Sequence, residues 1–173
     1  MSAILETVST RFAGRLLESG EPLGEPTIVV AVEHAIEVFR QLRDDPETKF
    51  EMLVDLTAVD YLGRTPRFDV VAQLYSLSKN HRLRVKIPVD GPEPTMPTLS
   101  GLWPSANWLE RECWDLLGIR FEGHPDLRRI LMYPEFEGHP LRKDYPVMKR
   151  QPLIPERDPV ENPWPPRLVG GKS

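Results

Sequence analysis

The stretch that decides the fold is residues 107–146, which read NWLERECWDLLGIRFEGHPDLRRILMYPEFEGHPLRKDYP. Five residues, Phe-Glu-Gly-His-Pro, occur in it twice, at residues 121–125 and again at residues 136–140. Each copy is followed by a basic pair, Arg128-Arg129 after the first and Arg142-Lys143 after the second. Loops with fixed backbone geometry and exposed charge carry function more often than they serve packing. We therefore look for the function of the chain in this stretch.

The first part of the stretch, residues 106–117, is predicted to be a helix. Ser105 suits the N-cap position, and Gly118 suits the end of the helix, where a left-handed residue is common. Cys113 is expected to be buried packing and not a thiol nucleophile. The other side chains that we expect in the core are Trp108, Leu109, Leu116 and Leu117.

The same helix carries three carboxylates, on Glu110, Glu112 and Asp115. Glu112 and Asp115 lie three residues apart on one face, and a carboxylate pair can serve in acid–base catalysis. The alternative is that the three carboxylates and Arg111 form ion pairs with nearby arginines and fix the helix in place. We favour this structural role, because no nucleophile or ligand set accompanies the carboxylates.

Length and composition describe one ordinary domain. The chain has 173 residues, 40% of them apolar and 28% charged, which is typical of a globular protein. The longest apolar run, residues 28–32, is far too short to cross a bilayer, and we see no secretion signal at the start. A net charge of −4 gives no reason to expect nucleic acid, and a lone cysteine cannot hold an iron–sulfur cluster. A cytoplasmic location fits best.

The residues before the central stretch predict an α+β fold, with an antiparallel or mixed sheet flanked by helices. Apolar residues at helical spacing predict a helix over residues 2–18 and another that starts near residue 33 and ends at Asp44-Asp45-Pro46. A short buried strand is expected between them, at residues 27–32. Three strands follow, over residues 50–61, 68–77 and 83–87, and the tight turns between them indicate an antiparallel meander. The inward side chains are expected to be Met52, Val54, Leu56 and Ala58, then Phe68, Val70, Ala72 and Leu74, then Leu83, Val85 and Ile87.

Prolines set the end of the chain apart. Nine of the 19 prolines fall between Pro134 and Pro166, a density that excludes helices and central strands. The segment is expected to form an extended arm that is either disordered or laid on the surface of another protein. We divide the chain into an α/β domain at residues 1–104, the helix with the repeated turns at residues 105–146, and an extended tail at residues 147–173.

The repeated turns also invite a metal-site hypothesis, with His124, His139, Glu122 and Glu137 as ligands. Zinc takes such ligands, but its motifs usually place histidines on a helix or pair them with cysteines. The alternative is that each Gly-His-Pro forms a rigid corner in which the imidazole binds a backbone carbonyl. We favour the corner and expect no catalytic residue, no cofactor and no stoichiometric metal in this chain.

The basic residues of the arm favour a docking function. Arg128, Arg129, Arg142 and Lys143 are interleaved with Tyr145 and other aromatic residues and with prolines. Arginine and aromatic side chains are enriched at the centres of protein–protein interfaces. A plain solvated surface is the alternative, but a rigid, basic, aromatic arm favours docking on a partner protein.

The motif from Glu110 to Pro146 resembles a known family. The run E-R-E-x-W-D-L-x-G-I-x-F-x-x-H-P-D-L-R-R-I-L, followed by E-G-H-P-L-R-K-D-Y-P, is similar to the signature of the 30 kDa subunit of respiratory complex I, called the C subunit in bacteria. The lead-in Trp103-Pro104-Ser105-Ala106-Asn107-Trp108 and the preceding strands also look like that family. The resemblance therefore covers most of the chain.

The resemblance implies a structural subunit of an enzyme whose chemistry lies in other chains. Such a subunit belongs to the peripheral arm of a proton-pumping NADH:quinone oxidoreductase, on the cytoplasmic side of the bacterial inner membrane. It packs on the 49 kDa-type D subunit, which frames the quinone site together with the subunit that carries the terminal iron–sulfur cluster. FMN and iron–sulfur clusters are expected in partner subunits. Homologous subunits of membrane-bound hydrogenases and formate hydrogenlyases, and a freestanding metal enzyme using His124 and His139, are the alternatives.

Overall fold

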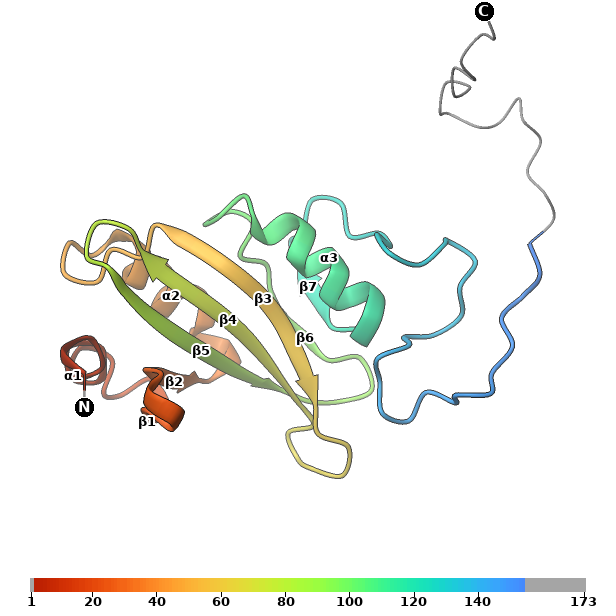
Figure 1. The fold of residues 1–173 in the computed structure, drawn as a ribbon, viewed down its shortest axis with the longest axis horizontal. Helices are drawn as coiled ribbons and strands as arrows, with labels where there is room; N and C mark the ends of the chain where they lie inside the picture. The colour runs from red at the N-terminus through yellow and green to blue at the C-terminus, as the bar shows by residue number, and fades with distance from the viewer. Residues whose placement is uncertain (1, 155–173) are drawn as a thin grey trace, which may run out of the picture.

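The computed structural model describes residues 2–154, and its centre is a five-stranded sheet (Figure 1). The strands are ordered β1-β2-β5-β4-β3 across the sheet. β2 runs parallel to β5, and every other neighbouring pair is antiparallel. The predicted α+β class with a mixed sheet is therefore confirmed. The strands are β1 Leu16–Gly20, β2 Thr27–Val30, β3 Met52–Asp60, β4 Phe68–Ser76 and β5 His81–Val89.

The helices lie on one face of this sheet and beside its edge strand β3 (Figure 1). They are α1 Ala3–Arg11, α2 Ala35–Asp44 and α3 Ala106–Leu117, and single 3-10 turns lie at η1 Pro22–Gly24 and η2 Val32–His34. In Figure 1, α2 lies behind the strands. The ring of Phe39 on α2 packs edge-on against Trp103, at 5.9 Å between centroids, so the segment that leads into α3 packs against α2. One core joins buried side chains from Ile4 to Phe121, and it crosses the predicted domain boundary at residue 104.

The meander is confirmed. β3, β4 and β5 are consecutive antiparallel neighbours, and alternate residues of the two inner strands point into the core. Burial of these side chains against the helices stabilises the sheet by about 25 cal/mol for each Å² of apolar surface removed from water. The buried inward residues are Phe68, Val70, Ala72 and Leu74 on β4 and Leu83, Val85, Ile87 and Val89 on β5.

The helix predicted over residues 2–18 is wrong in its second half. α1 ends at Arg11, and the chain turns and forms β1, which pairs with β2. Leu17, which would lie on the apolar face of such a helix, is 64% exposed. Gly14 weakens the helix by about 1 kcal/mol relative to alanine, and β2 offers a complete ladder of backbone hydrogen bonds. That ladder depends on the tertiary arrangement, so helical periodicity could not reveal it.

The inward face of β3 also differs from the prediction. Met52 and Val54 are 41% and 53% exposed, whereas Leu53 and Leu56 are 3% and 2% exposed. The pairing with β4 shifts between Leu53 and Asp55, which is a β-bulge. A bulge places one extra residue in the strand and reverses the alternation beyond it. The strand was predicted correctly, but the side chains before the bulge were assigned to the wrong face.

α3 has the predicted bounds, with corrections at its start. Trp108 is 67% exposed and is not part of the core. The Ser105 hydroxyl donates to the Leu53 carbonyl oxygen at 3.2 Å, so it anchors the helix to β3 and does not cap it. Before the helix, β6 Thr95–Pro97 pairs in parallel with β7 Arg120–Glu122.

The arm after β7 contains neither helix nor strand from residue 123 to residue 154. Most of the tail predicted at residues 147–173 lies outside the described residues, since the description ends at residue 154. Within residues 2–154, no helix has the length and apolar character needed to span a bilayer.

The bulge predicts opposite outcomes for two neighbouring substitutions in β3. Leu53→Ala should lower the free energy of unfolding by about 2–5 kcal/mol, because it empties a buried site. Val54→Ala should change it by less than about 1 kcal/mol, because that side chain lies at the surface. Equilibrium unfolding in urea measures both values. Equal losses for the two variants, or a larger loss for Val54→Ala, would show that the strand keeps the simple alternation.

Candidate docking site

The two repeated turns bind the two ends of α3. His124 Nε2 lies 3.0 Å from the Asn107 carbonyl oxygen, in the first turn of the helix. His139 Nδ1 lies 3.0 Å from the Asp115 carbonyl oxygen, in the last turn. The two copies of the five-residue sequence therefore form the same kind of contact, one at each end of α3. The predicted corner, in which each imidazole binds a backbone carbonyl, is confirmed.

These contacts engage both ring nitrogens of His124 and the Nδ1 of His139. His124 Nδ1 accepts a hydrogen bond from the Asp126 backbone N–H at 3.0 Å, so the proton is on Nε2 and is donated to Asn107. Burial lowers the pKa of His139, which favours its neutral form. Glu122 and Glu137 are exposed and do not converge on the rings. Within residues 2–154, no three His, Cys, Asp or Glu side chains are placed to share a metal ion.

Gly118 lets the second turn approach the end of α3. The residue is left-handed, with φ of 74°, and its N–H donates to the Trp114 carbonyl oxygen. A Cβ at this position would lie 2.5 Å from His139 Cδ2 and 2.6 Å from an Arg142 guanidinium nitrogen. Real Cβ atoms do not approach other atoms so closely, so a larger residue would be strained by the left-handed backbone and would displace the His139 and Arg142 side chains.

Asp115 is the main anchor of the arm. Its buried carboxylate accepts hydrogen bonds from three successive backbone N–H groups, at 3.0, 2.8 and 2.8 Å, which belong to Ile130, Leu131 and Met132. The Arg129 guanidinium donates to the same carboxylate at 2.6 Å. Burial alone raises the pKa of Asp115, but the hydrogen bonds from Met132, Arg129 and the other two amides lower it overall. The predicted ion pair with an arginine is confirmed for this residue.

Glu110 holds the segment before the helix. Its side chain is fully buried and accepts from the Leu99 N–H at 2.6 Å and from the Thr98 hydroxyl at 2.5 Å. His124 Nε2 lies 3.9 Å from the carboxylate. Burial raises the pKa of Glu110 to about 7, although the hydrogen bonds from Thr98 and Leu99 lower it. The expected ion pair of Glu110 with an arginine is therefore wrong, because the loop before the helix supplies its partners.

Arginines of the docking prediction also hold the arm together. The Arg129 guanidinium donates to the Phe136 and Gly138 carbonyl oxygens at 2.7 and 3.1 Å, in addition to Asp115. Arg142 donates through Nε to the Leu117 carbonyl oxygen at 2.6 Å, which caps the end of α3. A cation at this end is favoured because it meets unpaired carbonyls and the negative end of the helix dipole.

A cluster of ion pairs around Arg67, which we call the Arg67 clamp, joins the arm to the sheet. The sequence did not reveal it. Arg67 binds two carboxylates through its fork, Asp60 at 2.7 and 2.8 Å and Asp144 at 2.9 and 3.0 Å. The Lys143 backbone N–H donates to Asp60 at 2.8 Å. Arg67 lowers the pKa of both carboxylates. Its partner Asp144 is 77 residues away, so no local pattern could indicate the pair.

The remaining docking candidates face outward to different degrees. The Arg128 side chain is 71% exposed, and its one ion pair within residues 2–154 is with Asp126, itself exposed. Lys143 is exposed, and the Tyr145 ring is half-buried and stacks on Phe136 at 6.1 Å. Of the five predicted residues, Arg128 and Lys143 are accessible, whereas Arg129, Arg142 and Tyr145 are engaged within the chain. Whether the accessible residues contact a partner stays a prediction.

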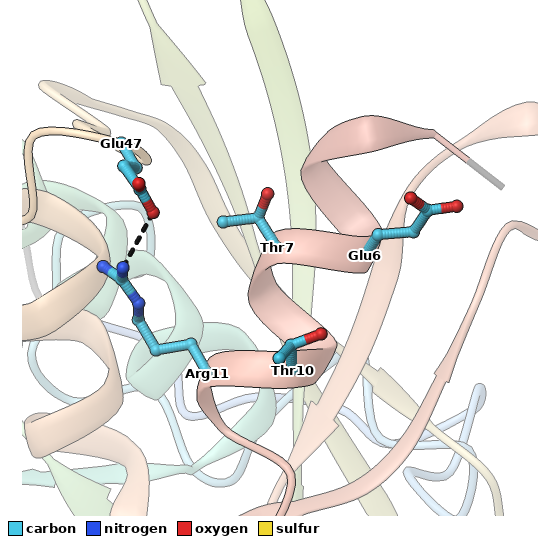
Figure 2. A pocket seen from close by; sticks show the side chains of 5 residues that line it. All are labelled: Glu6, Thr7, Thr10, Arg11 and Glu47. Carbon is cyan, nitrogen blue, oxygen red and sulfur yellow. Dashed lines mark hydrogen bonds and ion pairs between the residues drawn. The ribbon is translucent and has the colours of Figure 1, made fainter.

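A surface hollow of about 360 Å³ lies between α1 and the turn after α2. Figure 2 shows its lining, in which Arg11 reaches across to Glu47 at 2.7 Å while Glu6 points away from them. The other two lining residues are threonines on α1, and Arg11 also pairs with Asp45. This hollow holds a paired arginine at a polar surface and none of the residues singled out by the sequence.

Comparison with known proteins agrees with this architecture. Residues 28–151 match the family model described as the 30 kDa subunit of respiratory-chain NADH dehydrogenase. The C subunit of NADH-quinone oxidoreductase from Geotalea uraniireducens is 48% identical, covering 87% of this chain and 88% of that protein. The corresponding protein of a Roseiflexus species is 47% identical, covering 84% of each.

Solved structures share the fold. A trypsin-resistant fragment of Nqo5 superposes with a TM-score of 0.62 at 36% identity, covering 72% of this chain and 96% of the fragment. A chain of an archaeal membrane-bound sulfane sulfur reductase superposes with a TM-score of 0.71 at 23% identity. Fold and site thus define a compact α+β chain with an arm fixed along one helix. The chain belongs to the family of the 30 kDa subunit of respiratory-chain NADH dehydrogenase, or complex I.

The Asp115 anchor gives a stability prediction. Asp115→Asn removes the charge that holds Arg129 and three amides, and breaking a buried pair costs about 3–5 kcal/mol. The amides of residues 130–132 should then exchange with deuterium much faster, as measured by mass spectrometry of the full chain. Glu112→Gln on the exposed side of the same helix is the control and should change neither quantity. Unchanged protection of residues 130–132 in Asp115→Asn would contradict the anchor.

Glu110 gives a pH prediction. Its pKa in the folded chain, about 7, is above its ordinary value of 4.5, so the folded state binds this proton more tightly than the unfolded state. The resulting stabilisation is present below pH 4.5 and is lost as the pH rises through about 7. Glu110→Gln stays neutral and should avoid this loss. Between pH 4.5 and about 7, the free energy of unfolding of Glu110→Gln should therefore rise relative to that of the wild type, by on the order of 3 kcal/mol.

Urea unfolding of the two proteins at several pH values measures the effect. The lowered pKa values of Asp60, Asp115 and Asp144 act in the opposite direction at lower pH, but they are common to both proteins and cancel in the difference. Parallel stability curves for wild type and Glu110→Gln would show that Glu110 is ionised at no cost.

Proposed function

We propose that this chain is a non-catalytic structural subunit of the peripheral arm of a proton-translocating NADH:quinone oxidoreductase. It docks on the 49 kDa-type D subunit near the quinone site and contacts the subunit with the terminal iron–sulfur cluster and other peripheral-arm subunits. Membership of the 30 kDa subunit family supports the assignment to the complex. FMN and the iron–sulfur clusters belong to partner subunits, and the chain reaches the cytoplasmic side of the inner membrane only through the complex.

The observation that carries the docking role is the preorganised arm. Residues 121–146 are held on α3 and on the sheet by Asp115, both histidines, Arg142 and the Arg67 clamp. Little conformational entropy remains to be lost when such a segment binds. Arg128 and Lys143 project from it, beside exposed apolar side chains. These are Leu131, Leu141, Val147 and Met148, which are 54–96% exposed.

The side chains that could act in catalysis are buried or hydrogen-bonded within the chain, which supports a structural role. The Cys113 thiol is buried, and burial raises its pKa, which disfavours the nucleophilic thiolate. Both histidines and Asp115 serve backbone hydrogen bonds. The alternative of a membrane-bound hydrogenase or formate hydrogenlyase complex comes from the family resemblance alone, because the sulfane sulfur reductase chain, at 23% identity, shares only the fold. The NADH-quinone oxidoreductase relatives, at 46–48%, favour NADH as donor of the complex.

Charge reversal on the arm tests the docking. Arg128→Glu combined with Lys143→Glu should lower the yield of assembled complex after solubilisation, roughly 30-fold or more if one charge pair is buried in the interface. Arg40→Glu, on the exposed side of α2, is the matched control and should leave assembly unchanged. NADH:quinone turnover per intact complex should change much less than the yield.

Arg142→Ala tests whether the position of the arm on α3, and not only its exposed charges, is needed for assembly. It removes the hydrogen bonds to Leu117 and Gly118, so we expect weaker assembly together with faster exchange of the amides after residue 138. Normal assembly with abolished quinone reduction in either variant would instead indicate a direct catalytic role for the arm.

A further inference from the structure

The sheet has a second face that no helix covers within residues 2–154. All helices contribute to the core on the inner face, so the outward residues of β3, β4 and β5 face away from them. On β5 these outward residues are Arg82, Arg84 and Lys86, which alternate with the buried Leu83 and Val85. Alternate residues of a strand are roughly 6.6 Å apart on one face. Three cations therefore form a row along a central strand, which we call the β5 cation row.

The cross-strand neighbours of the β5 cation row carry no charge. Arg82 is opposite Tyr75 on β4, Arg84 is opposite Gln73, and Lys86 is opposite Val71. On the other side, β2 places Thr27 beside Arg84 and Val29 beside Lys86. Opposite charges placed directly across strands normally stabilise a sheet, and this row lacks them.

Two glutamates lie near the ends of the β5 cation row, but neither forms an ion pair with it within residues 2–154. Glu25 lines the same hollow as Arg82 and Arg84, and Glu18 lines the same hollow as Lys86. Among the ion pairs within residues 2–154, none joins either glutamate to the row. Three like charges at this spacing repel one another, so an anionic partner would gain from all three at once.

Two aspartates on the neighbouring strands also fail to pair with the β5 cation row. One is bound by another arginine, and the other lies too far from the row. Asp69 on β4 is bound by Arg64. Asp55 on β3 is exposed and lies opposite Gln73, so the whole width of β4 separates it from β5. Neighbouring strands are about 4.8 Å apart, which puts Asp55 two strand spacings from the row. Neither aspartate therefore neutralises the cations directly.

Two hollows flank the row and offer apolar surface beside it. The larger, of about 460 Å³, is lined by Met52, Val54 and Tyr75 together with Arg82 and Arg84. The second, of about 310 Å³, lies near the other end of β5 and includes Tyr61 and Pro88 with Lys86. The Arg82 guanidinium lies over the Tyr75 ring at 5.5 Å, an arrangement that keeps its fork oriented. An apolar pocket beside an arginine fork is typical of the centre of a protein interface.

We infer that this outer face is a second interaction surface, which binds an acidic segment of another protein. Carboxylates of the segment pair with Arg82, Arg84 and Lys86, and an apolar side chain between them enters the hollow formed by Met52, Val54 and Tyr75. A protein fits better than nucleic acid or a lipid surface, because the hollow is apolar and the chain as a whole is negative, at −4. The inference goes beyond the docking of the arm and does not depend on it, but it rests on the proposed assembly of the chain into a complex.

The test uses lysine reactivity in the purified complex and in the isolated full chain. Lys86 should react with an amine-acetylating reagent roughly tenfold more slowly in the complex, because an interface core excludes water and reagent. Lys79, in the turn between β4 and β5, is exposed and serves as the control, with the same rate in both samples. Zero-length carbodiimide coupling should join Lys86 to an Asp or Glu of another chain, identified by mass spectrometry.

Arg84→Glu supplies the matched variant. It should abolish the protection of Lys86 in the complex while leaving the melting temperature of the isolated chain unchanged, since the substitution lies on the outer face. Arg40→Glu, the control, should leave both the protection of Lys86 and the melting temperature unchanged. The acetylation rate of Lys143 measures protection of the arm in the same experiment. A variant that exposes Lys86 but not Lys143, or the reverse, therefore distinguishes the two surfaces.

Two results would overturn the inference. The first is equal reactivity of Lys86 in the complex and in the isolated chain. The second is protection of Lys86 in the isolated chain by phosphatidylserine vesicles or by a DNA duplex, with no cross-link to protein in the complex. That second result would assign the row to a lipid surface or to nucleic acid.

Discussion

The carboxylate of Asp115 is the constraint on which the arm depends. A segment without helix or strand still carries a backbone N–H at every residue except proline, and buried amides need partners. One ionised carboxylate satisfies three of them, at Ile130, Leu131 and Met132, and neutralises Arg129 at the same time. Because that charge is buried, it is stable only while all these donors are in place. The anchor therefore specifies one path for the chain across α3.

The repeated turns extend the same solution along the helix. Each glycine-histidine-proline corner places an imidazole against a carbonyl oxygen of α3, at Asn107 and at Asp115. Arg142 then caps the end of the helix, and Gly118 leaves room for it. Residues that look like ligands or catalysts in the sequence thus act as connectors between backbone segments. Polar side chains do here what a hydrophobic core does elsewhere, since a proline-rich segment has little apolar surface to bury.

The two surfaces that we propose for partners lie on different parts of the molecule. The arm offers isolated cations and exposed apolar side chains on a fixed backbone. The sheet offers a row of cations on a rigid strand, with apolar hollows beside it. A structural subunit gains from such a division, because one rigid core holds two contact regions at fixed positions relative to each other. Rigid presentation lowers the entropy lost on assembly at both.

The sequence by itself determined the elements whose causes are local. α3 and its end at Gly118, the meander and the inward residues of β4 and β5 follow from periodicity and turn residues, and the corners follow from their prolines and glycines. The family also followed, from one motif. Only the tertiary structure decided that residues 16–20 form a strand, that β3 bulges, that Trp108 is exposed and that Glu110 is paired with a loop. The Arg67 clamp belongs with these, because its partners are 7 and 77 residues away. Each of these features depends on a neighbour that is distant in sequence, and a local pattern carries no information about such a neighbour.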